Sequence, residues 1–157
     1  AGARATITRA AVSGQGAYGI VAQGTGGAPP TAATIADSTL EGNYAAVFAW
    51  SADATGVVEV SVRESQLAGT SFGAYALSSA GAAVSLVAGD NVVTLTTLEA
   101  IAAEGAGARV WARGNIVSGN GTALAALAGG LFESAGDNAV RDNATDKVGT
   151  ITVIAME

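Results

Sequence analysis

Histidine and cysteine are both absent from this chain of 157 residues, and Lys and Arg together number only seven. Without histidine no Ser-His pair can form, and without both residue types most zinc and copper sites lose their ligands. A glycosidase would need two carboxylates placed about 5–10 Å apart, which depends on the fold rather than on spacing along the chain. We therefore expect a protein that is not an enzyme and that holds no cofactor.

Positive charge is scarce, and this bears on the possible partners. The net charge is −6 and the seven basic residues are scattered, so no patch is available to neutralise the phosphates of a nucleic acid. No apolar run approaches the roughly 18 residues that span a bilayer. We expect neither a nucleic-acid partner nor membrane insertion.

Charged residues of both signs make up 13% of the chain, against about 25% in an average soluble domain. The mean hydropathy is +0.41. Such a chain leaves much uncharged surface, and surface of that kind often marks a contact between proteins. We predict that the protein packs against copies of itself; the alternative is a monomer with a neutral Ser/Thr surface.

What the chain does contain is short runs of alternating apolar and polar residues, which favour β-strands. The clearest is 57–63, and others lie at 43–51, 72–79, 83–87, 92–97, 108–117 and 149–156. Turn residues predict two hairpins, one joining 43–51 to 57–63 and the other joining 83–87 to 92–97 across Ala88-Gly89-Asp90-Asn91. Only 99–104 and 122–132 are helix candidates.

The predicted fold is therefore all-β, a two-sheet sandwich of jelly-roll type with at most one or two short helices, formed by 1–157 as a single domain. The tetrapeptide Ala-Gly-Asp-Asn occurs at 88–91 and again at 135–138. We interpret it as one turn used twice. No period of 20–50 residues supports a solenoid, so a solenoid is not predicted.

One stretch resembles a known family. Gly42-Asn43-Tyr44 precedes a strand, and Gly89-Asp90 forms the turn before another, within residues 40–97. This order is similar to the jelly-roll modules of the tumour-necrosis-factor and complement type, whose bacterial and phage relatives tip surface fibres. The resemblance implies a ten-stranded sandwich and a trimer. The chain departs from the family in its last strands, which are not rich in Phe, and in lacking a collagen-like stalk.

Several local patterns are candidate sites. The segment 136–146 holds Asp137, Asp142 and Asp146, oxygen ligands of the kind that bind Ca²⁺, but their spacing matches no calcium loop and the pattern favours a solvated loop. Asn120 and Asn143 begin glycosylation sequons. Gly14–Gly19 fits the dinucleotide pattern G-x-G-x-x-G, but the residues that follow cannot sustain the helix it requires.

Two segments are candidates for subunit contacts. Arg109, Trp111 and Arg113 alternate along one predicted strand and share a face. Residues 1–12 are the second segment. Within it 5–12, with Ile7 and Val12, is a predicted strand at the chain end that is free to lie at a sheet edge and pair with another chain.

These features predict a structural subunit of a virion or surface assembly, such as a phage head-decoration, tail or fibre-tip protein. Its partners would be copies of itself, as a trimer or larger array, and a capsid or tail protein; its location would be the virion or the cell exterior. A secreted filament or pilus subunit joined by strand addition and a carbohydrate-binding module remain as alternatives.

Overall fold

The structure, a computed structural model, describes residues 2–14 and 16–155, and all regular secondary structure in these ranges is β-strand. The nineteen strands form three sheets in which neighbouring strands run parallel. Sheet A contains β1 (Arg4–Thr8), β4 (Thr31–Ala36), β7 (Val58–Arg63), β10 (Val84–Gly89), β13 (Ala108–Arg113), β16 (Leu131–Ser134) and β19 (Ile151–Val153). Sheet B contains β2 (Ala11–Ser13), β5 (Thr39–Glu41), β8 (Gln66–Ala68), β11 (Val92–Thr94), β14 (Ile116–Ser118) and β17 (Ala139–Arg141). Sheet C contains β3 (Tyr18–Gly24), β6 (Ala45–Ser51), β9 (Phe72–Ser78), β12 (Glu99–Glu104), β15 (Thr122–Leu127) and β18 (Thr145–Val148).

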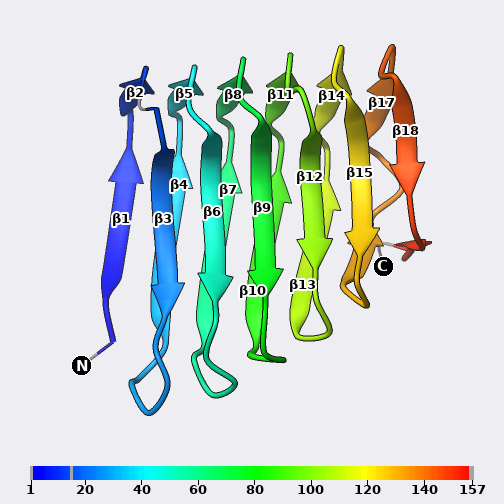
Figure 1. Cartoon of the computed structure of the whole chain (residues 1–157). Coiled ribbons are helices and arrows are strands. Elements are labelled where there is room, and N and C mark those ends of the chain that lie inside the picture. The colour runs from blue at the N-terminus through cyan, green and yellow to red at the C-terminus, as the bar shows by residue number, and fades with distance from the viewer. Residues whose placement is uncertain (1, 15, 156–157) are drawn as a thin grey trace.

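The chain winds through sheets A, B and C in turn and then starts the next circuit, so each strand pairs with the strand three places further along (Figure 1). This is a parallel β-solenoid of six turns, with β19 added to sheet A. The predicted two-sheet jelly-roll sandwich is wrong. Both predicted hairpins are wrong for the same reason: β10 pairs with β7 and β13, and β11 pairs with β8 and β14.

The core consists of straight rows of apolar side chains that run along the solenoid axis. In sheet B the paired residues Val12, Leu40, Leu67, Val93, Val117 and Val140 form one such row. Strand alternation places every second side chain inside, and the stacking of turns sets like residues on like. The valines of 57–63 that were predicted to share a face, Val58, Val60 and Val62, all lie in this core.

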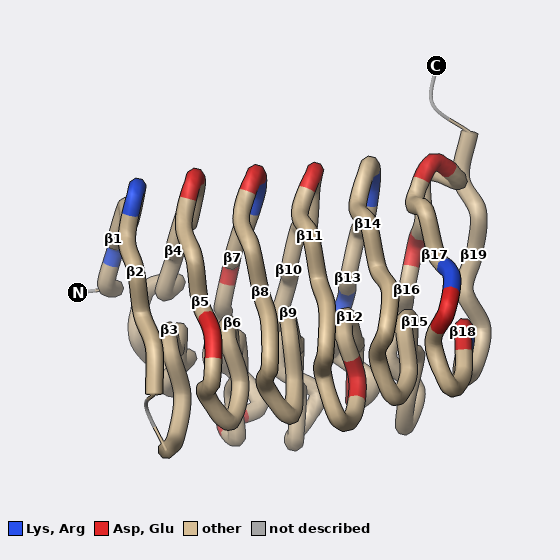
Figure 2. Tube along the Cα trace, turned by 90° about the horizontal axis from the view of Figure 1, so that it is seen from above, with Lys and Arg blue, Asp and Glu red and all other residues tan. Residues whose placement is uncertain are grey.

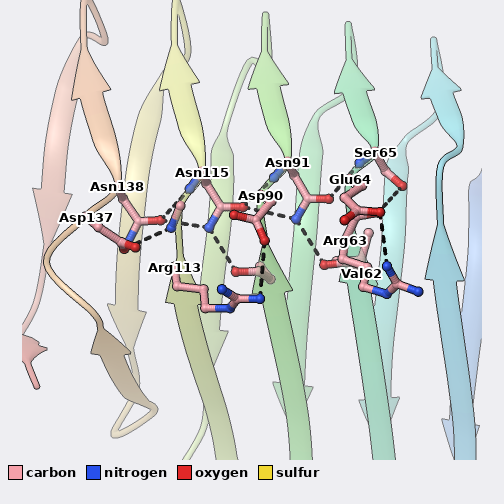
Figure 3. Close-up of polar contacts among 12 residues, drawn as sticks. Val62, Arg63, Glu64, Ser65, Asp90, Asn91, Arg113, Asn115, Asp137 and Asn138 are labelled. Carbon is pink, nitrogen blue, oxygen red and sulfur yellow. Dashed lines mark hydrogen bonds and ion pairs between the residues drawn. The ribbon is translucent and has the colours of Figure 1, made fainter. Parts of the chain in front are cut away.

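A second set of rows is polar and lies at the corner between sheets A and B. At this corner a residue in the left-handed conformation, such as Glu64 (φ 50°) or Asp90 (φ 57°), turns the chain. The next side chain then points inward and accepts a hydrogen bond from the backbone of the preceding turn. Figure 3 shows the resulting ladder of Ser65, Asn91, Asn115 and Asn138.

Asn91 shows how complete the bonding in this ladder is. Its Oδ1 accepts the backbone N–H of Ser65 at 3.1 Å, and its Nδ2 donates to the Val62 carbonyl at 3.0 Å. Its own backbone N–H and its Nδ2 both donate to Asn115 Oδ1 at 3.0 Å. A buried amide with all these partners stabilises the corner, because few of its polar groups are left without a hydrogen bond.

The ladder also corrects the interpretation of Ala-Gly-Asp-Asn. Its two copies are equivalent corners of different turns, and the bonds of the ladder join residues 28, 27, 26, 24 and 23 positions apart. The repeat exists, but its length falls along the chain. Five hexapeptides share the pattern Ser/Asn-x-Leu/Val-x-x-Asn/Thr: 38–43, 65–70, 91–96, 115–120 and 138–143.

The remaining differences concern helices and the family resemblance. The helix candidate 99–104 is strand β12, and 122–132 contains β15 and the start of β16. Gly42 (φ 64°) forms a corner between sheets B and C, and Gly89-Asp90 leads from sheet A to sheet B. The resemblance to tumour-necrosis-factor-type jelly rolls is therefore wrong, because these residues connect parallel sheets.

Candidate interaction surfaces

The three aspartates proposed for Ca²⁺ lie at different places in the last turn. Asp137 Oδ1 accepts the backbone N–H of Gly114 at the corner between sheets A and B. Asp142 is a left-handed corner residue after β17, and Asp146 lies on β18, where it accepts a hydrogen bond from Asn143. In residues 2–14 and 16–155 no three acidic, His or Cys side chains are grouped as metal ligands would be.

Both glycosylation sequons fall on a second polar ladder, at the corner between sheets B and C. Asn120 is 4% exposed, and its Nδ2 donates to the Val93 carbonyl and to Asn143 Oδ1. Asn143 Nδ2 donates in turn to the Val117 carbonyl. The nitrogen that would carry a glycan is thus used in the corner bonding at both positions.

The glycine motifs are corners as well. Gly14 has a φ of 66°, and strand β3, rather than a helix, follows the G-x-G-x-x-G segment; its Gln15 lies outside the described residues. Gly69-Thr70-Ser71-Phe72-Gly73 fits the G-x-S-x-G pattern of serine hydrolases, but strand β9 follows where those enzymes have a helix. The chain has no histidine to activate Ser71.

The most perturbed titratable groups lie on β9 and β12. Burial and a hydrogen bond from its hydroxyl to Glu104 raise the pKa of Tyr75. Burial, with repulsion from Glu104 as a smaller cause, raises the pKa of Glu99 above 4.5. Glu99 and Glu104 are separated by a strand length of about 16 Å. That separation exceeds the spacing of a glycosidase pair.

The outer face of sheet A carries most of the positive charge. Arg109, Trp111 and Arg113 share this face, as predicted from their alternation, and the Arg113 guanidinium lies 5.8 Å from the centre of the Trp111 ring. Arg113 also forms an ion pair with Asp90, and Arg63 pairs with Glu64. Figure 2 shows that both basic and acidic residues lie along the corner between sheets A and B.

Between Arg4 and the β13 residues, sheet A is covered mainly by small side chains. They line a shallow depression of about 410 Å³ across β4, β7 and β10. Its lining includes Ala32, Thr34, Ser61, Ser85 and Val87, with the charged Arg4 and Glu59 at one end. We call this depression the trough.

The outer face of sheet C is aromatic over its first three strands. The outward side chains of β3, β6 and β9 form what we call the aromatic face: Tyr18, Val21, Phe48, Trp50, Phe72, Tyr75 and Leu77. The Tyr18 and Phe48 rings stack with centres 4.9 Å apart and planes 17° from parallel. Because these two rings come from neighbouring strands and stack face to face, their planes are steep to the sheet and their edges point to solvent.

The two ends of the solenoid differ. In the first turn the inward residues Ile7, Val12 and Ile20 are only half-buried, although each pairs with a fully buried residue of the next turn. In the last turn Lys147 occupies the row position that Leu124 has in the turn before. Val140 and Ile151 continue apolar rows at the last end, and Val153 is 63% exposed there. The first end is therefore apolar, and the last is mixed, with Lys147 among apolar residues.

Among the described residues there is no helix of the length and apolarity needed to cross a membrane. Comparison with family models, with curated proteins and with solved structures found no match to this chain.

Proposed function

We propose that this chain is a structural subunit that works through contact with other copies of itself, in a virion or in an extracellular or cell-surface assembly. The observation that carries the proposal is the apolar open end of the first turn. Ile7, Val12 and Ile20 continue rows of the core, yet the described residues place no turn on their outer side.

The backbone at this end supports the same proposal. β1, β2 and β3 are the outermost strands of their sheets, so each has one edge along which no described strand lies. Open strand edges are templates for pairing with another chain. Strand addition at this edge is compatible with a virion subunit and with a filament subunit. Ile7 and Val12, at this edge, are the residues predicted from the sequence to take part in subunit contacts.

We assign the partner as the first turn of a second copy. The opposite end of the solenoid has Lys147 and Asp146 beside Val140 and Val153, and the two charged groups would lose hydration against an apolar surface. Two copies of the first turn are alike and apolar, and a contact between identical surfaces closes as a two-fold dimer.

Carbohydrate binding is supported less well. Sugars stack on the free faces of aromatic rings, whereas Phe48 stacks against both Tyr18 and Trp50. Phe48, at the centre of the aromatic face, therefore has neither ring face open to a sugar.

The test is the substitution Ile7→Lys, with Val153→Lys at the opposite end as its matched control. The mass in solution, measured by light scattering after gel filtration, should fall in Ile7→Lys and stay at the wild-type value in Val153→Lys. Circular dichroism would verify that both variants remain folded. A wild-type protein that keeps the 15.1 kDa of one chain at high concentration, or an Ile7→Lys variant of unchanged mass, would refute the end contact.

A further inference from the structure

A second surface, on the side of the solenoid, is also built for contact. We infer that the aromatic face of one copy docks on the outer face of sheet A of a second copy, with the two solenoid axes parallel. The inference extends the proposed assembly function and rests on it, but it uses different residues from the end contact.

The area of sheet C is sufficient for such a contact. Six strands about 4.8 Å apart and about 20 Å long cover roughly 600 Å² in projection. A stable interface buries about 800 Å² of accessible surface on each partner, and a pleated surface exceeds its projection. Exposed apolar side chains extend along this face from Val21, 44% exposed, to Val148, 36% exposed.

The charges on sheet C argue against a contact between two aromatic faces. Glu99 and Glu104 lie beside the aromatic residues on β12, and the described part of sheet C has its only cation, Lys147, on β18, where it aligns with the inward Leu124. Two such faces would bury four carboxylates without a counter-charge, which is strongly unfavourable.

The outer face of sheet A carries the positive charge that the outer face of sheet C lacks. Arg4 and Arg109 are exposed and form no ion pair within the described residues, and Arg113 lies beside the Trp111 ring. Arginines can pair with Glu99 and Glu104 and can also lie over aromatic rings. The small side chains of the trough leave room for projecting rings. Glu59 in the trough can accept hydrogen bonds from the exposed tyrosine hydroxyls of Tyr18 and Tyr44.

The order of these features along the axis sets the orientation. On sheet C the aromatic residues come from β3, β6 and β9, and the acids follow on β12. On sheet A the trough spans β4, β7 and β10, and the arginines with Trp111 follow on β13. Parallel copies offset by one turn place rings over the trough and acids opposite arginines. Reversed copies would set the rings against Arg109, Arg113 and Glu133.

A contact between two different faces makes a specific prediction about mixtures. One variant carries Val21→Lys and Leu77→Lys on the aromatic face, and a second carries Ser85→Glu and Arg109→Glu on sheet A. Both are made in the Ile7→Lys background, so the end contact does not contribute. Val92→Lys, on the outer face of sheet B, is the matched control.

Each face variant alone should associate at least tenfold more weakly than the control. An equal mixture should form a dimer of twice the 15.1 kDa chain mass, because one intact aromatic face meets one intact sheet A. If the sheet A variant associates as the control does, the aromatic face pairs with itself and the inference is wrong. It is also wrong if the mixture stays monomeric. The end contact is tested separately, by whether Ile7→Lys alone lowers the mass of the wild-type protein. That result does not depend on how the face variants behave.

Discussion

Replacing Asn115 by Ala should reveal how much of the stability depends on the corner ladder. Asn115 is fully buried, and its Oδ1 accepts hydrogen bonds from the backbone and from Nδ2 of Asn91. Its Nδ2 donates to the Ala88 carbonyl at 2.9 Å and to Asn138 Oδ1 at 2.7 Å. The substitution leaves the backbone N–H and one Nδ2 hydrogen of Asn91 buried without the acceptor that they share.

Each unpaired buried polar group costs about 1–3 kcal/mol, and partial relaxation brings the expected loss to about 3–5 kcal/mol. That is a large share of the roughly 5–15 kcal/mol by which a domain is stable. Asn115→Ser should lose less, since a serine hydroxyl already serves as the acceptor at Ser38 and Ser65.

The matched control is Asn138→Ala at the last step of the same ladder. Asn138 is half-exposed, so water can replace its bonds, and we expect a loss of about 1 kcal/mol. Urea denaturation followed by circular dichroism measures both variants. If Asn138→Ala lowers the free energy of unfolding as much as Asn115→Ala does, the stabilising effect of the ladder does not depend on its burial.

Two further substitutions test single polar groups. The raised pKa of Glu99 favours its protonated form in the folded state, so the stability linked to this group is present below pH 4.5 and is lost as the pH rises through the folded-state pKa. Glu99→Gln should therefore raise the melting temperature at pH 7, and this gain over the wild type should shrink below pH 4.5. Added salt should not remove the gain, because burial is the leading cause of the shift. A gain that stays the same from pH 7 to below pH 4.5 would contradict the raised pKa of Glu99. Thr70 Oγ1 is buried with no hydrogen-bond partner among the described residues, whereas Thr96 Oγ1 donates to Asn120. In urea denaturation, Thr70→Val should be neutral or stabilise by up to about 1 kcal/mol and Thr96→Val should destabilise by a similar amount; the opposite order would show that the Thr70 hydroxyl is bonded in solution.

Several strands could be located from the alternation of residues alone. The predicted runs 57–63 and 72–79 correspond to β7 and β9, and the shared face of Arg109, Trp111 and Arg113 is present. The helix prediction for 99–104 rested on a capping pattern and that for 122–132 on Ala and Leu, but sheet C contains a strand in both segments. Trp50 lies in an apolar run of the sequence, yet it is half-exposed on the aromatic face.

The sites were harder to predict, because they depend on which turns lie next to one another. Asp137, Asp142 and Asp146 are close in the chain, yet Asp137 lies at the corner between sheets A and B, Asp142 at the corner after β17, and Asp146 on β18. Ser65, Asn91 and Asn115 are far apart in the chain, yet they are bonded in one ladder. The signal that could have found the ladder was the Ser/Asn-x-Leu/Val-x-x-Asn/Thr hexapeptide, whose spacing shrinks from turn to turn.

The sequence by itself determined that the chain is β-rich, lacks the residues of common catalytic and transition-metal sites, and bears little charge. These properties are local or additive, since alternation has a period of two residues and composition needs no fold. Only the tertiary structure decided that the strands run parallel, because a single left-handed residue such as Asp90 serves a solenoid corner as readily as a hairpin. Paired residues of partner strands lie 19 to 28 positions apart in the chain. The stacking of whole turns, with Val on Val and Asn on Asn, selects these partners.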